Sequence, residues 1–236
     1  TEFENLNRHF MGLAQAGRKV LLVDADAQGS LTLSLGWEPD ELPITLYDLM
    51  IKAIQDKSVT HGEGMLHHEE GVDLLPANIE LAGMEHRERV MTQMLENAKD
   101  DFDYIFIDCP PSLGLITLNA LCAADGVLIP IQCEYYALEG VSALMGTIQK
   151  VQKMNRHLAI EGVVLTMLDA RTNLGVQVAQ EVRKVFKNKV YKTVIPRNVR
   201  LGEAPSHGLP IHLYDPRSLG AQSYQQLATE FLEREQ

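Results

Sequence analysis

The chain has 236 residues, of which 45% are hydrophobic and 22% charged, a composition typical of a folded globular protein rather than a disordered or fibrous one. Its formal net charge of −11 argues against a surface that is basic all over, although a local basic patch is compatible with it. The longest apolar runs are far shorter than the roughly 18 residues of a membrane span. The acidic, polar start at residues 1–5 is unlike a signal peptide.

Predicted strands and helices alternate along the chain. An amphipathic helix comes first, with Phe3, Leu6, Phe10 and Leu13 on one face and Gly17 after its end. Apolar, β-branched runs predict strands at 19–24, 72–76, 103–108, 126–131, 160–166 and 190–195. Helical periodicity predicts helices at 79–98, 113–123, 137–154, 175–186 and 218–233. This order favours an α/β fold with a mainly parallel sheet and helices on both faces. No linker interrupts it, so we expect a single domain over residues 1–236.

The cysteines and one group of histidines could in principle bind a metal, but their spacing favours a structural role. The three cysteines, Cys109, Cys122 and Cys133, show no C-x-x-C spacing, so we expect buried free thiols in a reducing cytoplasm. The irregular segment 45–70 holds three histidines without a nearby cysteine or a helical i,i+4 pair, which favours a polar surface excursion over a metal site. Those histidines are His61, His67 and His68. We assign this segment no function.

Carboxylates follow two of the predicted strands at the point where each strand ends. Asp24 and Asp26 close the strand at 19–24, and Asp108 closes the strand at 103–108. Any one of them alone would more often be a helix cap or a turn residue. In an open parallel sheet, however, ligands bind beyond the carboxyl ends of the strands, and Mg²⁺ prefers oxygen ligands. Taken together, the three side chains predict a site that surrounds a magnesium-bound phosphate.

The usual companion of such a site is missing from the sequence. No G-x-x-x-x-G-K-[ST] motif or close variant occurs, so there is no loop of this type to cradle phosphates with its backbone N–H groups and a lysine. The 236 residues therefore contain half of an ATPase site.

Four sequence blocks, at residues 24–29, 104–113, 130–140 and 195–208, resemble the ParA/Soj family of chromosome- and plasmid-partitioning ATPases. The resemblance runs from about residue 13 to the C-terminus. The family begins with a strand and a phosphate-binding loop before its first helix, and this chain is expected to lack that segment. The resemblance implies a P-loop NTPase-like α/β fold without its first strand and loop.

The resemblance also implies ATP and Mg²⁺ as cofactors and gives roles to individual residues. Asp26 would position or activate the attacking water, and Asp24 would lie near the magnesium and phosphate. Asp108 would be the Walker B acid, which holds Mg²⁺ through water. Pro196 and Asn198 lie in a loop that resembles the one contacting adenine, so both are candidate nucleotide-binding residues.

In the family, an ATP-bound homodimer binds double-stranded DNA without sequence preference through arginines and works with a ParB-like partner protein. Arg171 and Arg200 occupy matching positions in this sequence. Lysine and arginine contacts to phosphates give affinity that is independent of sequence and sensitive to salt. The resemblance thus implies a cytoplasmic, nucleoid-associated protein. Further positive charge nearby comes from Lys187, Lys189, Lys192 and Arg197.

Two other functions remain as alternatives. A non-catalytic DNA- or partner-binding regulator could keep the family's surfaces without turning over ATP, and measurement of ATP binding would distinguish the two. A MinD-like membrane ATPase would need a basic amphipathic C-terminal helix. Residues 227–236 carry three glutamates and one arginine, so we expect no membrane partner.

Overall fold

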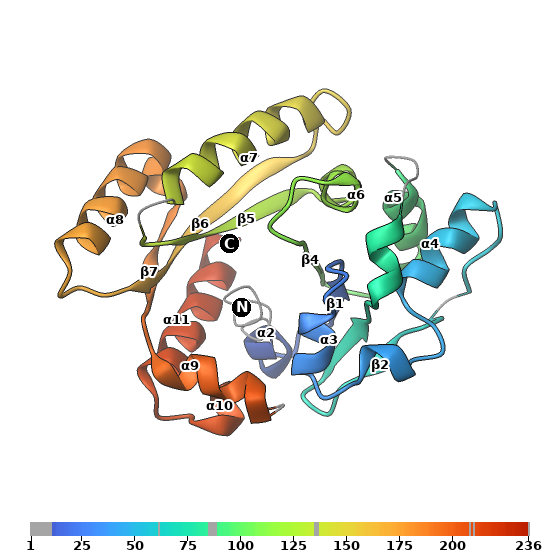
Figure 1. Cartoon of the computed structure of the whole chain (residues 1–236), viewed down its shortest axis with the longest axis horizontal. Helices are drawn as coiled ribbons and strands as arrows, with labels where there is room; N and C mark the ends of the chain where they lie inside the picture. Colours follow the sequence, from blue (N-terminus) through green and yellow to red (C-terminus); the bar gives the residue numbers. More distant parts are fainter. Residues whose placement is uncertain are drawn as a thin grey trace. The chain divides into compact units, whose positions relative to one another are not determined.

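The computed structural model describes residues 11–60, 62–84, 89–134, 137–207, 209 and 211–235. The chain divides into two compact units, an N-terminal unit of residues 1–124 and a C-terminal unit of residues 125–236. Each unit has its own sheet (Figure 1) and is described by itself. The expectation of a single domain over residues 1–236 stays a prediction.

The N-terminal unit contains a four-stranded sheet in the order β2-β3-β1-β4. Its strands are β1 (Val20–Asp24), β2 (Leu66–His67), β3 (Val72–Leu75) and β4 (Tyr104–Asp108). β1 pairs in parallel with both β3 and β4, and only the short β2 runs antiparallel. Every residue of β1 is buried, as expected for the central strand of a parallel sheet.

Helices cover this sheet. They are α2 (Met11–Gln15), α3 (Ser30–Ser34), α4 (Leu46–Ile54), α5 (Val90–Leu95) and α6 (Leu115–Ala123), with 3₁₀ turns η2 (Pro39–Glu41), η3 (Ile79–Gly83) and η4 (Glu96–Ala98). Leu21 and Val23 of β1 pack in one hydrophobic cluster with side chains of α4, α5 and α6. α2 and α3 also contact β1. The core of this unit therefore forms around β1, the strand that ends in Asp24.

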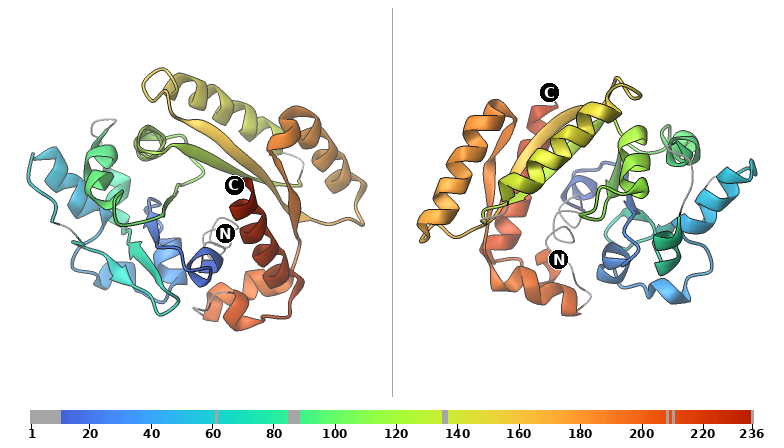
Figure 2. Two further views of the ribbon diagram at one scale, coloured as in Figure 1. Left: turned by 180° about the vertical axis from the view of Figure 1, so that it is seen from behind. Right: turned by 45° about the horizontal axis from the view of Figure 1, so that its top comes forward.

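The C-terminal unit contains a parallel sheet in the order β5-β6-β7. The strands are β5 (Gly126–Gln132), β6 (Ala159–Leu168) and β7 (Val190–Pro196). α7 and α8 lie on one side of this sheet and α11 on the other (Figures 1 and 2). Its helical elements are α7 (Ala137–Val151), α8 (Asn173–Phe186), η5 (Lys187–Lys189), α9 (Val199–Glu203), η6 (Ala204–His207), α10 (Ile211–Tyr214) and α11 (Leu219–Arg234).

Two side chains of α11 bind the backbone of the edge strand β7. The Glu230 carboxylate accepts hydrogen bonds from the backbone N–H groups of Lys192 and Thr193, both at 2.8 Å. The Arg234 guanidinium donates to the carbonyl of Val190 at 2.9 Å and to Glu230 at 2.9 Å. It also lies 3.9 Å from the centre of the Tyr191 ring. Among the described residues, no further strand pairs with this edge of β7. Side chains of the last helix form hydrogen bonds with its backbone groups instead.

The six predicted strands are confirmed, with ends that differ by no more than two residues. The predicted helices at 113–123, 137–154, 175–186 and 218–233 correspond to α6, α7, α8 and α11. The parallel pairing of every strand except β2 confirms the mainly parallel α/β fold. Among the described residues, no helix is both long and apolar enough to cross a membrane.

The predicted helix at 79–98 is wrong as a continuous element. Met84 has an extended backbone after η3, and Arg89 is not helical, so the described part consists of η3, α5 and η4. Of the predicted first helix, Phe3, Leu6 and Phe10 lie outside the described residues, whereas Leu13 is fully buried in α2. The apolar periodicity at 79–98 therefore arises from buried side chains in two separate elements, η3 and α5.

Segment 45–70 is more regular than the sequence interpretation suggested. It contains α4 and β2, and α4 begins with a capping box between Thr45 and Asp48. The Asp48 carboxylate accepts from the backbone N–H of Thr45 at 2.8 Å and from its hydroxyl at 3.0 Å. A threonine followed three residues later by an acidic residue is a helix-start signal that was visible in the sequence.

Candidate functional site

The two predicted acidic strand ends lie side by side in the N-terminal unit. β1 and β4 are adjacent and parallel, and Asp24 is the register partner of Asp108. The backbone N–H of Ala25 donates to the Asp108 carbonyl at 2.8 Å, so the two strands remain paired where the loops begin. The topology therefore brings Asp24 and Asp108 to one edge of the sheet, as expected.

Asp24 is completely buried, and the protein itself binds both of its carboxylate oxygens. Oδ2 accepts from the backbone N–H of Thr32 at 2.8 Å and from the Thr32 hydroxyl at 2.7 Å, and Oδ1 accepts from the backbone N–H of Asp26 at 3.2 Å. Burial raises the pKa of Asp24 to about 6, and the bonds from Thr32 oppose that rise only in part. In this geometry Asp24 fastens the start of α3 to the end of β1.

Thr32 extends this network to a third segment. Besides donating to Asp24, its Oγ1 accepts from the backbone N–H of Ala77, in the loop after β3, at 3.1 Å. Both hydrogen-bonding capacities of the hydroxyl are used in a fully buried position. Thr32 was not among the predicted site residues, although a polar residue between Leu31 and Leu33 is a signal that could have identified it.

The loop between β1 and α3 presents Asp26 in a tight turn. The Asp26 side chain is half-buried, and its Oδ1 accepts from the backbone N–H of Gln28 at 3.0 Å. Gly29 has a φ of +61°, and a Cβ at this position would lie 2.8 Å from Cγ of Pro39. A side chain would clash there, so glycine is required, and the backbone N–H of Gly29 closes the turn by donating to the Asp26 carbonyl at 2.9 Å.

Cys109 follows Asp108 directly in the chain, just after the end of β4. The pKa of this thiol is raised to about 12, first by burial and then by the negative charges of Asp108 and Asp26. Cys109 therefore stays protonated and unreactive at neutral pH. All three cysteines are free thiols, as expected, but only Cys133 is fully buried, whereas Cys109 and Cys122 are partly exposed.

The residues present fit a magnesium ion held largely by water and phosphate. In the part of the chain that the structure describes, no three His, Cys, Asp or Glu side chains are grouped as a metal site. Asp24 is engaged by Thr32, and the predicted site around a magnesium-bound phosphate stays a prediction. Mg²⁺ usually retains several waters and takes one or two carboxylates together with substrate phosphates. Asp108, with Asp26 nearby, matches that requirement.

The histidines of segment 45–70 have other partners. His67 Nδ1 lies 2.8 Å from Oδ1 of Asp73, and the His68 ring meets the Trp37 ring edge-on, with centroids 5.5 Å apart. His61 lies outside the described residues. The interpretation of these histidines as surface side chains agrees with these contacts.

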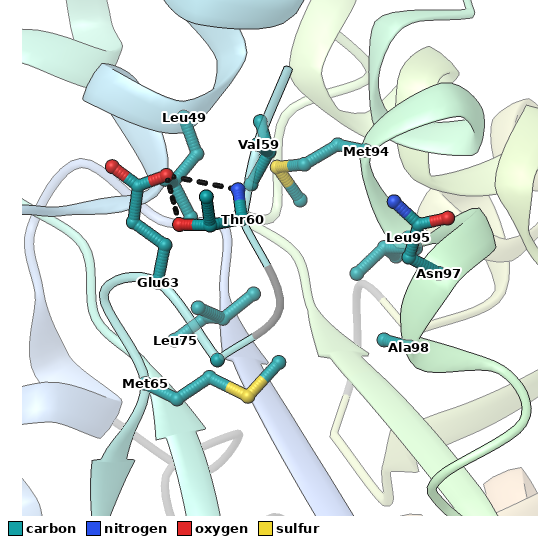
Figure 3. A pocket seen from close by; sticks show the side chains of 11 residues that line it. Leu49, Val59, Thr60, Glu63, Met65, Leu75, Met94, Leu95, Asn97 and Ala98 are labelled. Carbon is teal, nitrogen blue, oxygen red and sulfur yellow. Dashed lines mark hydrogen bonds between the residues drawn. The ribbon is translucent and has the colours of Figure 1, made fainter.

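A small cavity in the same unit contains none of the predicted site residues (Figure 3). Its volume of about 20 Å³ leaves room for roughly one water molecule. Apolar side chains, among them Leu49, Leu75 and Met94, line most of it. On the polar side, the Thr60 backbone N–H and hydroxyl donate to Glu63 at 3.1 and 3.0 Å. A nucleotide does not fit in this space.

In the C-terminal unit, Pro196 is the last residue of β7 and Asn198 lies just beyond it. Pro196 is the register partner of Leu168, the last residue of β6, and the backbone N–H of Arg197 donates to the Leu168 carbonyl at 3.1 Å. The Asn198 side chain caps α9, because its Oδ1 accepts from the backbone N–H of Arg200 at 2.9 Å. The loops after β6 and β7 are therefore neighbours.

Arg171 lies in the loop after β6 and Arg200 lies in α9, and each forms an ion pair. Arg171 pairs with Asp169 through two hydrogen bonds of 2.9 and 2.8 Å. Arg200 pairs with Glu203 at 2.8 Å and with Asp215 at 3.5 Å. The sequence analysis identified the arginines and missed these carboxylates. Of the supporting cations, Lys187, Lys189 and Lys192 are exposed around η5 and β7, and Arg197 pairs with Glu134 at 2.9 Å.

Comparisons with known proteins agree with these features. A family model described as an AAA domain (AAA_31) matches residues 6–160. The sporulation initiation inhibitor protein Soj of Bacillus subtilis is 54% identical over 226 residues, covering 92% of this chain and 88% of that protein. The chromosome partitioning protein ParA of Myxococcus xanthus is 46% identical, covering 94% of this chain and 80% of that protein. Among solved structures, cobyrinic acid a,c-diamide synthase from Mycobacterium smegmatis with a bound ATP analog and magnesium is 35% identical, with a TM-score of 0.81 over 98% of this chain and 88% of that one.

Proposed function

Since the chain belongs to the ParA/Soj family of chromosome-partitioning ATPases, we propose that it acts in chromosome or plasmid segregation. In this proposal it forms a homodimer with ATP, binds double-stranded DNA without sequence preference, hydrolyses ATP and works with a ParB-like partner on the nucleoid in the cytoplasm. The observation that carries the proposal is the pairing of Asp24 with Asp108 at neighbouring strand ends, beside the constrained loop of Asp26.

The acidic strand ends suggest a division of roles within the nucleotide site. Asp26 is the candidate for orienting the attacking water, because it lies in a fixed turn and its side chain is only half-buried. Asp108 would hold Mg²⁺ through water, and the ion would neutralise charge on the phosphates. Asp24 would act near the magnesium by holding the loop in place, since its oxygens bind Thr32 and Asp26. In the C-terminal unit, Pro196 and the Nδ2 amide of Asn198 are the candidate contacts to adenine.

The catalytic assignment is tested with Asp26→Ala. Residues 1–236 contain no phosphate-binding motif, so the experiment supplies that segment upstream of Thr1. We expect hydrolysis to be lost while ATP-dependent dimerisation is retained, because the proposed role acts on water and not on binding. ATP turnover and sedimentation with ATP would be measured together. Loss of ATP binding in the variant would contradict the assignment.

The DNA assignment is tested by salt dependence and by sequence dependence. Binding through Arg171 and Arg200 should fall steeply as salt rises and should be equal for duplexes of different sequence, because phosphates and not base edges are contacted. Arg171→Glu or Arg200→Glu should weaken binding to all duplexes alike. A marked preference for one duplex at constant salt would count against the assignment.

A non-catalytic DNA- or partner-binding regulator is the second candidate. Without a backbone nest and a lysine facing the phosphates, residues 1–236 alone should bind ATP weakly. Calorimetry with ATP and magnesium separates the candidates. Micromolar affinity would support the ATPase, whereas DNA affinity that is equal with and without nucleotide would support the regulator.

A further inference from the structure

Three arginines follow the carboxyl ends of β6 and β7, in the adjoining loops and in α9, and we call this region of the C-terminal unit the arginine edge. Each arginine is paired with a carboxylate of the same unit: Arg171 with Asp169, Arg197 with Glu134, and Arg200 with Glu203. The arginine edge therefore carries much less net positive charge than its arginines alone would suggest. An anionic partner has to compete with these carboxylates.

Asp169 binds Arg171 in the same geometry that a phosphate would use, so the two anions would compete for this arginine. Nε of Arg171 donates to Oδ1 of Asp169 at 2.9 Å, and Nη2 donates to Oδ2 at 2.8 Å. This two-pronged arrangement is also the one in which arginine binds a phosphate. The Arg171 side chain is 89% exposed, so DNA could reach it without any movement of the core.

The charge of Asp169 is not needed to hold its loop. The backbone N–H and the hydroxyl of Thr172 both donate to the Asp169 backbone carbonyl, at 3.0 and 2.9 Å, and the Thr172 hydroxyl accepts from Gly175 N–H. Among the described residues, the Asp169 side chain accepts one backbone hydrogen bond, from the N–H of Arg171 at 3.0 Å, and an asparagine oxygen could accept it equally well. Glu203 differs, because it also accepts from the Tyr214 hydroxyl at 3.1 Å.

The Asp169 carboxyl is charged at neutral pH. The Arg171 side chain lowers the pKa of this carboxyl to about 2. Protonation therefore cannot free the arginine near neutral pH. Only another anion can take the place of the carboxylate.

We propose that Asp169 competes with DNA phosphates for Arg171 and thereby keeps the DNA affinity of a single chain low. This inference rests on the proposed DNA contact of Arg171. Each binding event exchanges a carboxylate–guanidinium pair for a phosphate–guanidinium pair, so only the difference between the two pairs contributes to affinity. When single contacts are weak, firm binding requires two copies acting together on one duplex.

The experiment measures binding of the full chain to a labelled duplex of mixed sequence by fluorescence anisotropy at low salt. Asp169→Asn should raise the affinity about two- to fivefold, the range expected when an exposed ion pair no longer competes. The increase should disappear in the double variant Asp169→Asn with Arg171→Gln, which should match Arg171→Gln alone. The matched control is Glu96→Gln, which makes the same change in net charge at an exposed ion pair with Lys99 in the N-terminal unit.

The outcomes separate the inference from the proposed function. If Arg171→Gln weakens binding but Asp169→Asn gains no more than Glu96→Gln, the inference is wrong and the DNA contact stands. A decrease in affinity with Asp169→Asn would also overturn the inference, because it would mean that the carboxylate orients Arg171 for DNA. If neither the unmodified chain nor any variant binds the duplex at low salt, both the DNA contact and the inference fail.

Discussion

The two units of the chain differ in charge far more than in architecture. Residues 1–124 contain 8 Lys and Arg against 21 Asp and Glu, whereas residues 125–236 contain 13 against 11. Their net charges are therefore −13 and +2, although both units are built on parallel strands covered by helices. In both, the candidate residues lie at the carboxyl ends of strands or in the segments that follow them. The topology determines where the functional residues lie, and the residue types determine which ligand each unit suits.

The units also differ in how they treat charged side chains. The N-terminal unit buries Asp24 completely and supports it with a hydroxyl and backbone donors. The C-terminal unit leaves the ion pairs of its candidate DNA-binding residues, Arg171 and Arg200, exposed. Changes to the buried network should therefore alter stability, and changes to the exposed pairs should alter mainly binding.

The largest expected effect tests whether the units unfold independently. In Gly162→Ala, the added Cβ would lie 2.2 Å from Cε2 of Tyr191, a fully buried ring, so the C-terminal unit should lose about 3 kcal/mol of stability. Trp37, the single tryptophan, lies in the N-terminal unit and reports on that unit alone. Urea unfolding by circular dichroism should reveal an early transition, while the midpoint of Trp37 fluorescence stays unchanged.

The control for this prediction is Gly146→Ala in α7, where a Cβ meets nothing within 4 Å. It should be neutral or should stabilise the helix by up to about 1 kcal/mol. If Gly162→Ala shifted the Trp37 fluorescence midpoint as much as the circular dichroism midpoint, the two units would unfold as one. Their stabilities would then not be independent.

A somewhat smaller effect is expected for Asp24→Asn, and it should depend on pH. Burial raises the pKa of Asp24 from its ordinary value of 3.8 to about 6, so the folded state binds this proton more tightly than the unfolded state. As pH rises from about 4 to 6, the unmodified chain should lose up to about 3 kcal/mol relative to the variant. Unfolding free energies of both proteins across that range would measure the difference. A constant difference would mean that the carboxyl is not desolvated.

Thr32→Val should have the smallest effect of the three, about 2 kcal/mol at neutral pH. Valine has the shape of threonine but cannot donate to Asp24 or accept from Ala77, which leaves a buried carboxylate and a buried N–H each short of a hydrogen bond. Thr32→Ser keeps the hydroxyl and should recover most of the loss in chemical denaturation. If serine were as destabilising as valine, packing of the methyl group and not the hydrogen bonds would explain the effect.

The parts of the structure that follow from local sequence could be predicted, and those that depend on distant partners could not. The apolar runs located six strands, and the rule for parallel sheets correctly brought Asp24 and Asp108 together. The role of Thr32 depends on Ala77, 45 residues away, which no local pattern reveals. The pairing of Arg171 with Asp169 was missed because it depends on the turn geometry of a loop. The catalytic, nucleotide and DNA roles of the candidate residues stay predictions.

The contact between α11 and β7 has a consequence for self-association. An open strand edge can add a strand from a second molecule, which is a common route to aggregation. Glu230 and Arg234 occupy the N–H groups of Lys192 and Thr193 and the carbonyl of Val190, so an incoming strand would have to displace a carboxylate and a guanidinium. At this edge, growth of the sheet from one chain into the next is therefore blocked by side chains of the last helix.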